Sequence, residues 1–249
     1  MIFAVSLWVA LAAAASDPTP DPAAQACPKE MAAIPGGRFK LAERGDEATV
    51  KPFCLDVTEV TVAAHEACAK SGACKPASTT ENLPEAPPAA AAERSKLCNA
   101  AKAERRQDPL NCVSWDEAAA HCAAVGKRLP TEEEWEWAAR GASRGTAFPW
   151  GDEEPDAQLC WNRNPKGQPL GTCPVGAHPK SDTPQGVKDL AGNVWEWTSS
   201  RDDCGRAEQC PIRRGGGWSS KTANRVNAGV RMGDQRTQRQ TDIGFRCAR

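Results

Sequence analysis

The chain contains no tyrosine, only three histidines, and no long apolar run beyond its first residues. Without such a run, the mature chain is not expected to contain a transmembrane segment. Lysine and arginine number 31 against 32 acidic residues, and no basic cluster occurs, so nucleic acid and anionic membrane are not expected partners. The chain also lacks a phosphate loop and a dinucleotide fingerprint, which argues against nucleotide binding.

The N-terminus is the one apolar stretch, MIFAVSLWVALAAAA, and it is too short to span a membrane comfortably. Ala13 and Ala15 stand in the A-x-A relation that a signal peptidase requires, although no lysine or arginine precedes them. We expect residues 1–15 to be a signal peptide cleaved near Ala15, so that the protein is exported to the periplasm or outside the cell. The alternative is a buried N-terminal helix. Residues 16–29 are predicted to form a proline-rich tether, and residues 30–249 one domain.

Cysteine is abundant, with twelve residues, which is typical of an oxidising compartment unless the thiols bind metal. Zinc sites favour closely paired cysteines with histidines nearby, whereas here the cysteines are not two or three apart and the histidines are scattered. Disulfides are therefore expected, with connectivity open. His65 and His121 have no nearby partner in sequence, and no acid–base role is predicted for them. The pairs that spacing favours are Cys68 with Cys74, Cys160 with Cys173, and Cys204 with Cys210.

Three helices can be placed from capping residues and stop signals. Thr61 can cap a helix of about ten residues, and the pairs Ser114-x-x-Glu117 and Thr131-x-x-Glu134 are capping boxes. The proline- and alanine-rich segment 75–110 is too long for an ordinary connection and is predicted to be a surface excursion pinned by Cys98. Glycine and proline punctuate short apolar pieces beyond residue 141, which predicts a loop-rich α+β fold.

The C-terminal half holds five specific segments: GKRLPTEEEWEWAAR (126–140), FPWG (148–151), GNVWEW (192–197), RRGGGW (213–218) and GFRC (244–247). Their unequal spacing excludes a repeat. Together they resemble the formylglycine-generating enzyme, or sulfatase-modifying-factor, family. The resemblance covers about residues 30–249, and it implies the α+β sulfatase-modifying-factor fold. That fold is a C-type-lectin-like variant with short strands and few helices, here disulfide-stabilised.

The resemblance also implies a chemistry that this chain is not expected to perform. Enzymes of the family oxidise a sulfatase cysteine to formylglycine with oxygen and a copper ion held by two cysteines. The matching positions are Ser220 and Arg225, and no cysteine lies between Cys210 and Cys247. Copper(I) prefers thiolate ligands, so copper binding and oxidase activity are not expected. The resemblance places a candidate ligand cleft at Arg214, Gly217, Trp218, Ser220 and Arg225.

Calcium is the cofactor that the resemblance implies. In the family, the turn matching GNVWEW binds Ca²⁺, which carries over to the Asn193 and Glu196 side chains and the Val194 carbonyl. Hard oxygen ligands suit this ion, which needs six to eight of them. The alternative is that Trp195 and Trp197 simply anchor a tight turn. A second family loop begins at Asn162 but lacks the acidic turn, so no second site is expected.

These observations predict an exported accessory or binding module without formylglycine-generating activity, whose ligand is a peptide, a protein or a glycan. Three alternatives stay open: an enzyme of different chemistry on the same scaffold, a divergent peptide-modifying oxidase, and a structural component of the cell envelope. Cys204 and Cys210 would be the redox pair of such an oxidase, although a loop-closing disulfide is the favoured interpretation.

Overall fold

The computed structural model describes residues 26–83, 87–162, 171–205 and 208–249. The predicted signal peptide 1–15 and most of the predicted tether 16–29 lie outside these ranges. Every helix within the described ranges is too short or too polar to cross a bilayer. The described residues form short strands, four α-helices and long connecting loops, and this is the α+β, loop-rich and disulfide-stabilised architecture that the sequence predicts.

Two small antiparallel sheets form the N-terminal part. Strand β1 (Met31–Ile34) pairs with β4 (Phe53–Asp56), and β2 (Gly37–Lys40) pairs with β3 (Glu47–Val50). A Cβ at Gly37 would overlap the Trp137 ring, so the glycine lets the β2–β3 hairpin approach helix α4.

The third sheet has four strands in the order β7-β6-β5-β8. Its strands are β5 (Trp195–Asp202), β6 (Cys210–Arg214), β7 (Arg231–Gly233) and β8 (Ile243–Gly244). Strand β5 runs antiparallel to β6 and parallel to β8, and Glu196 lies opposite Arg214 on one side and Gly244 on the other. Two of the family-like segments, GNVWEW and RRGGGW, therefore meet at the centre of this sheet.

The α-helices are α1 (Val62–Lys70), α2 (Pro88–Ser95), α3 (Trp115–Ala124) and α4 (Glu132–Ala139), with 3-10 turns η1 (Ala103–Arg105), η2 (Ala142–Arg144), η3 (Pro179–Ser181) and η4 (Ala223–Arg225). Three of these four α-helices, α1, α3 and α4, begin where the capping residues predict, whereas α2 has no side-chain cap and is not predicted by the sequence. Thr61 accepts from the Ala64 amide, and both capping boxes are complete. Each satisfies backbone N–H groups that the first helical turn leaves without partners.

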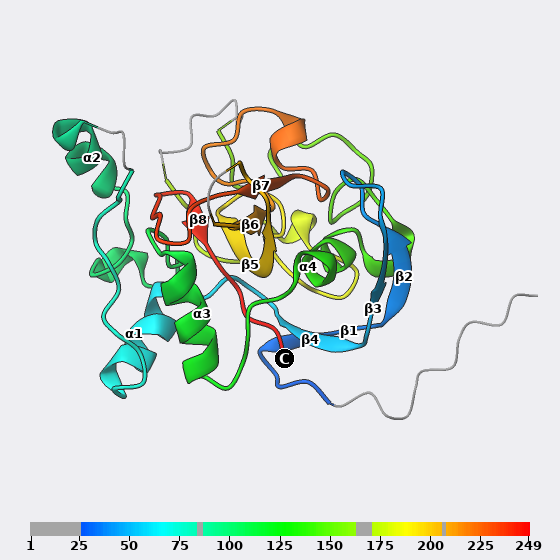
Figure 1. Cartoon of the computed structure of the whole chain (residues 1–249), viewed down its shortest axis with the longest axis horizontal. Helices are drawn as coiled ribbons and strands as arrows, with labels where there is room; N and C mark the ends of the chain where they lie inside the picture. The colour runs from blue at the N-terminus through cyan, green and yellow to red at the C-terminus, as the bar shows by residue number, and fades with distance from the viewer. Residues whose placement is uncertain (1–25, 84–86, 163–170, 206–207) are drawn as a thin grey trace, which may run out of the picture.

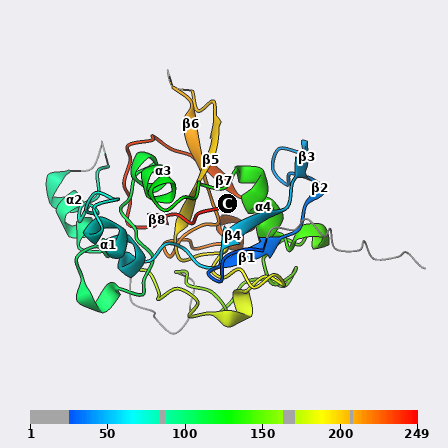
Figure 2. The same cartoon turned by 90° about the horizontal axis from the view of Figure 1, so that it is seen from below.

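Helices α1, α2 and α3 gather on one side of the molecule, and the β2–β3 hairpin lies on the opposite side (Figures 1 and 2). The four-stranded sheet and α4 lie between them (Figure 1). The core follows this division. One apolar cluster, around Trp135 and Trp137, joins α4 to the N-terminal strands, and a second, around Trp197 and Phe245, joins the sheet to α1 and α3. Large buried tryptophans thus supply the apolar area that the short strands cannot.

All twelve cysteines are paired. The disulfides are Cys27–Cys54, Cys68–Cys74, Cys98–Cys112, Cys122–Cys247, Cys160–Cys173 and Cys204–Cys210. They include the three pairs that spacing favours, and they place Cys204 and Cys210 in a loop-closing bond. The other three join segments whose proximity only the tertiary structure creates.

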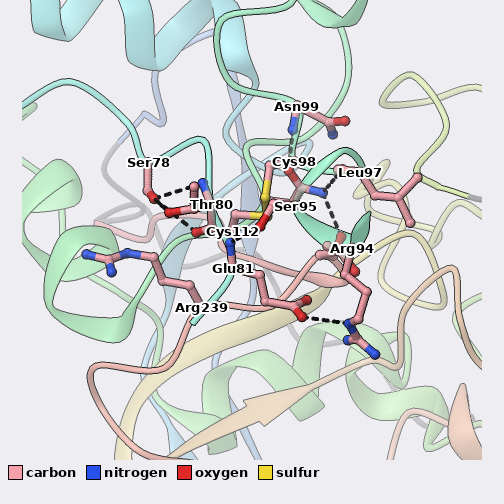
Figure 3. The surroundings of a disulfide bond; sticks show 12 residues. Ser78, Thr80, Glu81, Arg94, Ser95, Leu97, Cys98, Asn99, Cys112 and Arg239 are labelled. Carbon is pink, nitrogen blue, oxygen red and sulfur yellow. Dashed lines mark hydrogen bonds and ion pairs between the residues drawn. A yellow bond between two sulfur atoms is a disulfide. The ribbon is translucent and has the colours of Figure 1, made fainter. Parts of the chain in front are cut away.

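The excursion 75–110 is held together by contacts within it, and the disulfide that Cys98 forms with Cys112 ties it to the residues just beyond its end (Figure 3). Beside it, the buried Glu81 carboxylate accepts from Arg94 Nε at 2.6 Å, and the Glu81 amide donates to Ser95 Oγ at 3.0 Å (Figure 3). Asn99 Nδ2 adds a bond of 2.9 Å to the Pro109 carbonyl. Cys98 pins the segment as predicted, and the segment contains α2 and η1.

The Cys122–Cys247 disulfide is expected to stabilise the fold most, because its cysteines are 125 positions apart and both are fully buried. Replacing both by alanine should lower the free energy of unfolding by about 5 kcal/mol in the chain-entropy model. The matched control removes Cys204–Cys210, whose cysteines are six positions apart, and should cost about 2 kcal/mol. Urea denaturation measures both. Equal losses would contradict this assignment.

Candidate functional site

A buried ion pair lies at the base of the GNVWEW turn. The Glu196 carboxylate accepts from Arg246 Nε at 2.7 Å and Nη2 at 2.8 Å, and both side chains are fully buried. Trp135 Nε1 donates to the same carboxylate at 2.7 Å. Burial disfavours the Arg246 cation, but the adjoining carboxylate outweighs it and raises the pKa of Arg246. Glu196 therefore compensates the buried positive charge of Arg246.

Two further carboxyl groups lie close to this pair. Burial, followed by the proximity of Asp189, raises the pKa of Glu59 well above its ordinary value. Burial also raises the pKa of Asp189, whose backbone has a φ of +57°. Glu59 Oε1 accepts from Asn193 Nδ2 at 3.0 Å, while Glu59 Oε2 is buried without a hydrogen-bond partner. Burial and the neighbouring Asp189 therefore favour the neutral form of the Glu59 carboxyl group.

The predicted calcium ligands are only partly free to bind an ion. Asn193 Oδ1 accepts from the Cys173 amide at 3.0 Å, and both oxygens of Glu196 accept from Arg246. Glu196 does not fit as a calcium ligand, because Arg246 already occupies its coordination space. Near this turn, Glu59 Oε2 is a buried carboxylate oxygen without a hydrogen-bond partner, and it is a candidate to bind a cation. Residue Asn162 is described, but the loop that follows it lies outside the described residues.

Arg214 does not line a cleft, contrary to the prediction. It is fully buried, its Nη2 donates to the Glu136 carboxylate, and its Nη1 donates to the Gly229 carbonyl at 3.2 Å. Glu136 lies on the side of α4 that faces the sheet. Because 78 positions separate it from Arg214, no local sequence pattern predicts this pairing. The arginine joins α4 to β6 and has a structural role.

Gly217 and Trp218 are also packed into the body and do not line a cleft. A Cβ at Gly217 would lie 2.9 Å from the Asp242 carbonyl oxygen and 3.2 Å from the Trp195 ring, so the missing side chain makes room for that ring. Gly216, at a φ of +73°, approaches the Arg225 carbonyl too closely for any Cβ. Trp218 Nε1 donates to the Thr241 carbonyl at 3.0 Å.

Ser220 and Arg225, the two positions that match the family's copper cysteines, have different environments. Ser220 is buried in a tight turn, where its amide donates to the Gly217 carbonyl at 2.9 Å and its Oγ accepts from the Gly217 amide at 3.2 Å. Arg225 is exposed, and its guanidinium lies 6.0 Å from the centroid of the Trp195 ring. Of the predicted cleft residues, only Arg225 is presented to solvent.

The Arg225 surface, defined here as Arg225, Trp195, Ser219 and Asp242, combines a cation with hydrogen-bonding groups. The Arg213 guanidinium also lies over the Trp195 ring, 5.0 Å from its centroid. Ser219 Oγ donates to Asp242 Oδ2, and Asp242 Oδ1 is buried without a partner. Within the described ranges, Arg225 has no carboxylate partner, and its Nη1 lies 3.1 Å from Met232 Sδ. Trp195 itself is buried, so the exposed Arg225 guanidinium is the group that can hold an anionic ligand here.

The prediction that His65 and His121 have no partner is wrong. They lie on α1 and α3 with their Nδ1 atoms 3.0 Å apart, and Cys74 Sγ lies 3.4 Å from His121 Nδ1. Burial, followed by the charges of His65 and Lys127, lowers the pKa of His121 to about 4, and burial lowers the pKa of His65. Fifty-six positions separate the histidines, so no local pattern reveals their pairing.

The raised pKa of Glu59 has a measurable consequence for stability. A carboxyl group whose folded pKa exceeds its unfolded value of about 4.3 stabilises the fold at low pH, and this stabilisation is lost as pH rises toward the folded pKa. Glu59→Gln stays neutral, so its free energy of unfolding should gain on the parent between about pH 5 and 8. The gain is up to about 1.4 kcal/mol per pH unit. Urea denaturation across this pH range measures it.

Glu93→Gln is the matched control for this experiment, because Glu93 forms an exposed ion pair with Lys96 and is 71% exposed. Its stability relative to the parent should stay nearly constant over the same pH interval. Parallel pH curves for Glu59→Gln and the parent would show that the Glu59 carboxyl group is ionised in the folded state.

The chain is similar to known proteins in sequence and in fold. A family model described as sulfatase-modifying factor enzyme 1-like domain matches residues 16–249. Inactive C-alpha-formylglycine-generating enzyme 2 of Bos taurus is 40% identical over 156 residues, which are 58% of this chain and 51% of that protein. Formylglycine-generating enzyme of Mus musculus is 41% identical over 105 residues, 38% of this chain and 28% of that protein. The chain spans about half the length of the first of these relatives.

Solved structures show the same fold. PvdO from Pseudomonas aeruginosa superposes with a TM-score of 0.69 at 24% identity, covering 88% of this chain and 93% of that one. Treponema denticola variable protein 1 gives a TM-score of 0.62 at 19% identity, with 88% and 94% covered. The predicted family resemblance is confirmed, and the chain belongs to the sulfatase-modifying factor enzyme 1-like family.

Proposed function

We propose that this protein is an exported member of its family that lacks formylglycine-generating oxidase activity and acts as a binding or accessory module. The observation that carries the proposal is the chemistry at Ser220 and Arg225. Neither residue provides a thiolate, and all twelve cysteines of the chain are engaged in disulfides. Copper(I) therefore lacks the soft ligands that it prefers at this place.

Export is supported by the disulfides, because six such bonds persist in an oxidising compartment and not in a reducing cytosol. The relatives named inactive C-alpha-formylglycine-generating enzyme 2 are consistent with a family member that performs no oxidation. A binding role is supported by the Arg225 surface. Its exposed cation suits a peptide, protein or glycan ligand that carries an anionic group.

The loss of oxidase chemistry can be tested directly with copper(I), oxygen and a synthetic peptide from the cysteine-containing segment of a sulfatase. We expect no formylglycine by mass spectrometry. The double variant Ser220→Cys, Arg225→Cys restores thiols at both positions, and we expect it to bind copper(I) more tightly than the parent in a chelator competition. Formylglycine formed by the parent at enzymatic rates would overturn the proposal.

Binding is tested with the same peptide by calorimetry, using Arg225→Ala. We expect affinity to fall by about tenfold, as for loss of one charge-assisted contact of roughly 1.4 kcal/mol. Arg201→Ala is the matched control, because Arg201 is also exposed and lies over a tryptophan, 4.4 Å from the Trp115 centroid. Equal effects of the two substitutions would remove the Arg225 surface from the proposal.

Calcium at the GNVWEW turn stays a prediction, with Glu59 in place of Glu196 as the carboxylate. An ion bound only by the folded chain raises its melting temperature with increasing concentration. We expect calcium to raise the melting temperature of chelator-treated protein, and Glu59→Gln to abolish that rise. Magnesium serves as the control ion, because it dehydrates reluctantly and demands octahedral geometry. An unchanged melting temperature in calcium would remove the prediction.

A further inference from the structure

We propose that His65, Cys74 and His121 form a latent site for a thiophilic metal ion such as Zn²⁺, which becomes competent when the Cys68–Cys74 disulfide is reduced. The candidate ligand atoms of these three residues all lie within 4.8 Å of one another. They lie where α1 meets α3, at the wall of a cavity of about 300 Å³. The site is separate from the Arg225 surface, so the inference does not depend on the proposed function.

The distances between the ligand atoms suit a tetrahedral ion. His65 Nδ1 and His121 Nδ1 are 3.0 Å apart, and Cys74 Sγ is 3.4 Å from His121 Nδ1. Around tetrahedral zinc, with bonds of about 2.0 Å to nitrogen and 2.3 Å to sulfur, neighbouring ligand atoms are separated by about 3.3 to 3.6 Å. The two observed separations differ from these values by a few tenths of an ångström, and the ligand atoms of His65 and Cys74 lie within 4.8 Å of each other. One thiolate and two imidazoles are ligands that zinc and copper(I) accept and that calcium and magnesium do not.

The hydrogen bonds of His65 orient it as a ligand. Its Nε2 lies 3.0 Å from the Lys75 carbonyl oxygen, which only accepts, so Nε2 carries the proton. The lone pair of neutral His65 is therefore on Nδ1, directed at His121. An N–H donated to a backbone carbonyl is the usual outer contact of a metal-bound histidine. In the absence of metal, one proton on His121 Nδ1 satisfies both rings, and a metal ion would take the place of that proton.

The disulfide controls the third ligand. While Cys74 is bonded to Cys68, its sulfur cannot act as a thiolate. A dithiol reductant supplies two electrons and two protons, becomes a disulfide itself, and leaves thiols on both cysteines. The Cys74 thiol then releases its proton to water as it binds the metal ion. Cys74 is half-buried and only six positions from Cys68, so exchange is accessible and opening this bond removes only a short-loop constraint.

The cavity supplies the fourth coordination position. Its wall also contains Asp116 and Glu117, but these carboxylates are paired with Arg236 and Arg239. Three protein ligands and an open position filled by water are therefore expected. This arrangement is the one that exposed, exchangeable zinc sites adopt, in contrast to closed four-ligand structural sites.

The variant Cys68→Ser frees the Cys74 thiol without any reductant. After metal stripping, we expect it to bind about one Zn²⁺ per chain, and Co²⁺ in its place to give the sulfur-to-cobalt absorption of a thiolate site. Cys204→Ser is the matched control, because it opens a disulfide of the same sequence separation. We expect its zinc affinity to be at least tenfold lower in a competition with a chromophoric chelator.

Two further comparisons assign the ligands. In the Cys68→Ser background, His65→Ala and His121→Ala should each lower zinc affinity by at least about 10- to 100-fold, because loss of even an outer contact to a metal ligand costs this much. The parent chain should bind no zinc at this site when oxidised and should bind it after mild dithiol treatment. Mass spectrometry of alkylated thiols identifies which disulfide has opened.

Zinc affinity of Cys68→Ser no higher than that of Cys204→Ser, or unaffected by both histidine substitutions, would overturn the proposal. Circular dichroism reports whether Cys68→Ser folds. If Cys68→Ser does not fold, the dithiol-treated parent chain is the test. Zinc uptake after the Cys68–Cys74 bond has opened would support the proposal, and no uptake would overturn it.

Discussion

The ion pair between Glu196 and Arg246 is the contact on which the rest of the structure depends. Arg246 also donates from Nη1 to the Asp56 carbonyl at 3.0 Å and from Nη2 to the Lys188 carbonyl at 2.8 Å. All three nitrogens of this fully buried guanidinium are engaged, which offsets the several kcal/mol that an unpaired buried charge costs. The contacts of Arg246 therefore join the C-terminal segment to β4, to β5 and to the loop before GNVWEW.

These contacts explain why family-like segments persist in a chain without the thiols for copper. GNVWEW supplies Glu196, GFRC supplies Arg246, and the long segment at 126–140 supplies Trp135, which donates to the same carboxylate. RRGGGW supplies Arg214, whose guanidinium is held by Glu136 from that same long segment. The signature residues are thus structural contacts of the scaffold. The two positions that the resemblance matches to copper-binding cysteines lie beyond RRGGGW, and they are Ser220 and Arg225.

The parts of the structure that sequence predicted rest on local physics. Capping boxes at Ser114 and Thr131 act within one helical turn, and the Cys68–Cys74 and Cys204–Cys210 pairs close short loops of six positions. The incorrect expectations concern distant partners. Arg214 was expected in a cleft and instead pairs with Glu136, 78 positions away, and the pairing of His65 with His121 spans 56 positions.

The sequence by itself determined the family, the helix starts, the disulfide-rich character and the absence of copper thiols, because each depends on residue identity or on spacing along a few turns. Only the tertiary structure decided which side chains are available. It pairs Glu196 with Arg246, packs Gly217 against the Trp195 ring and leaves Arg225 exposed. It also brings the ligand atoms of two histidines and a cysteine within 4.8 Å of one another. Whether a side chain can bind a ligand or an ion depends on its burial and on its long-range partners, and tertiary packing determines both.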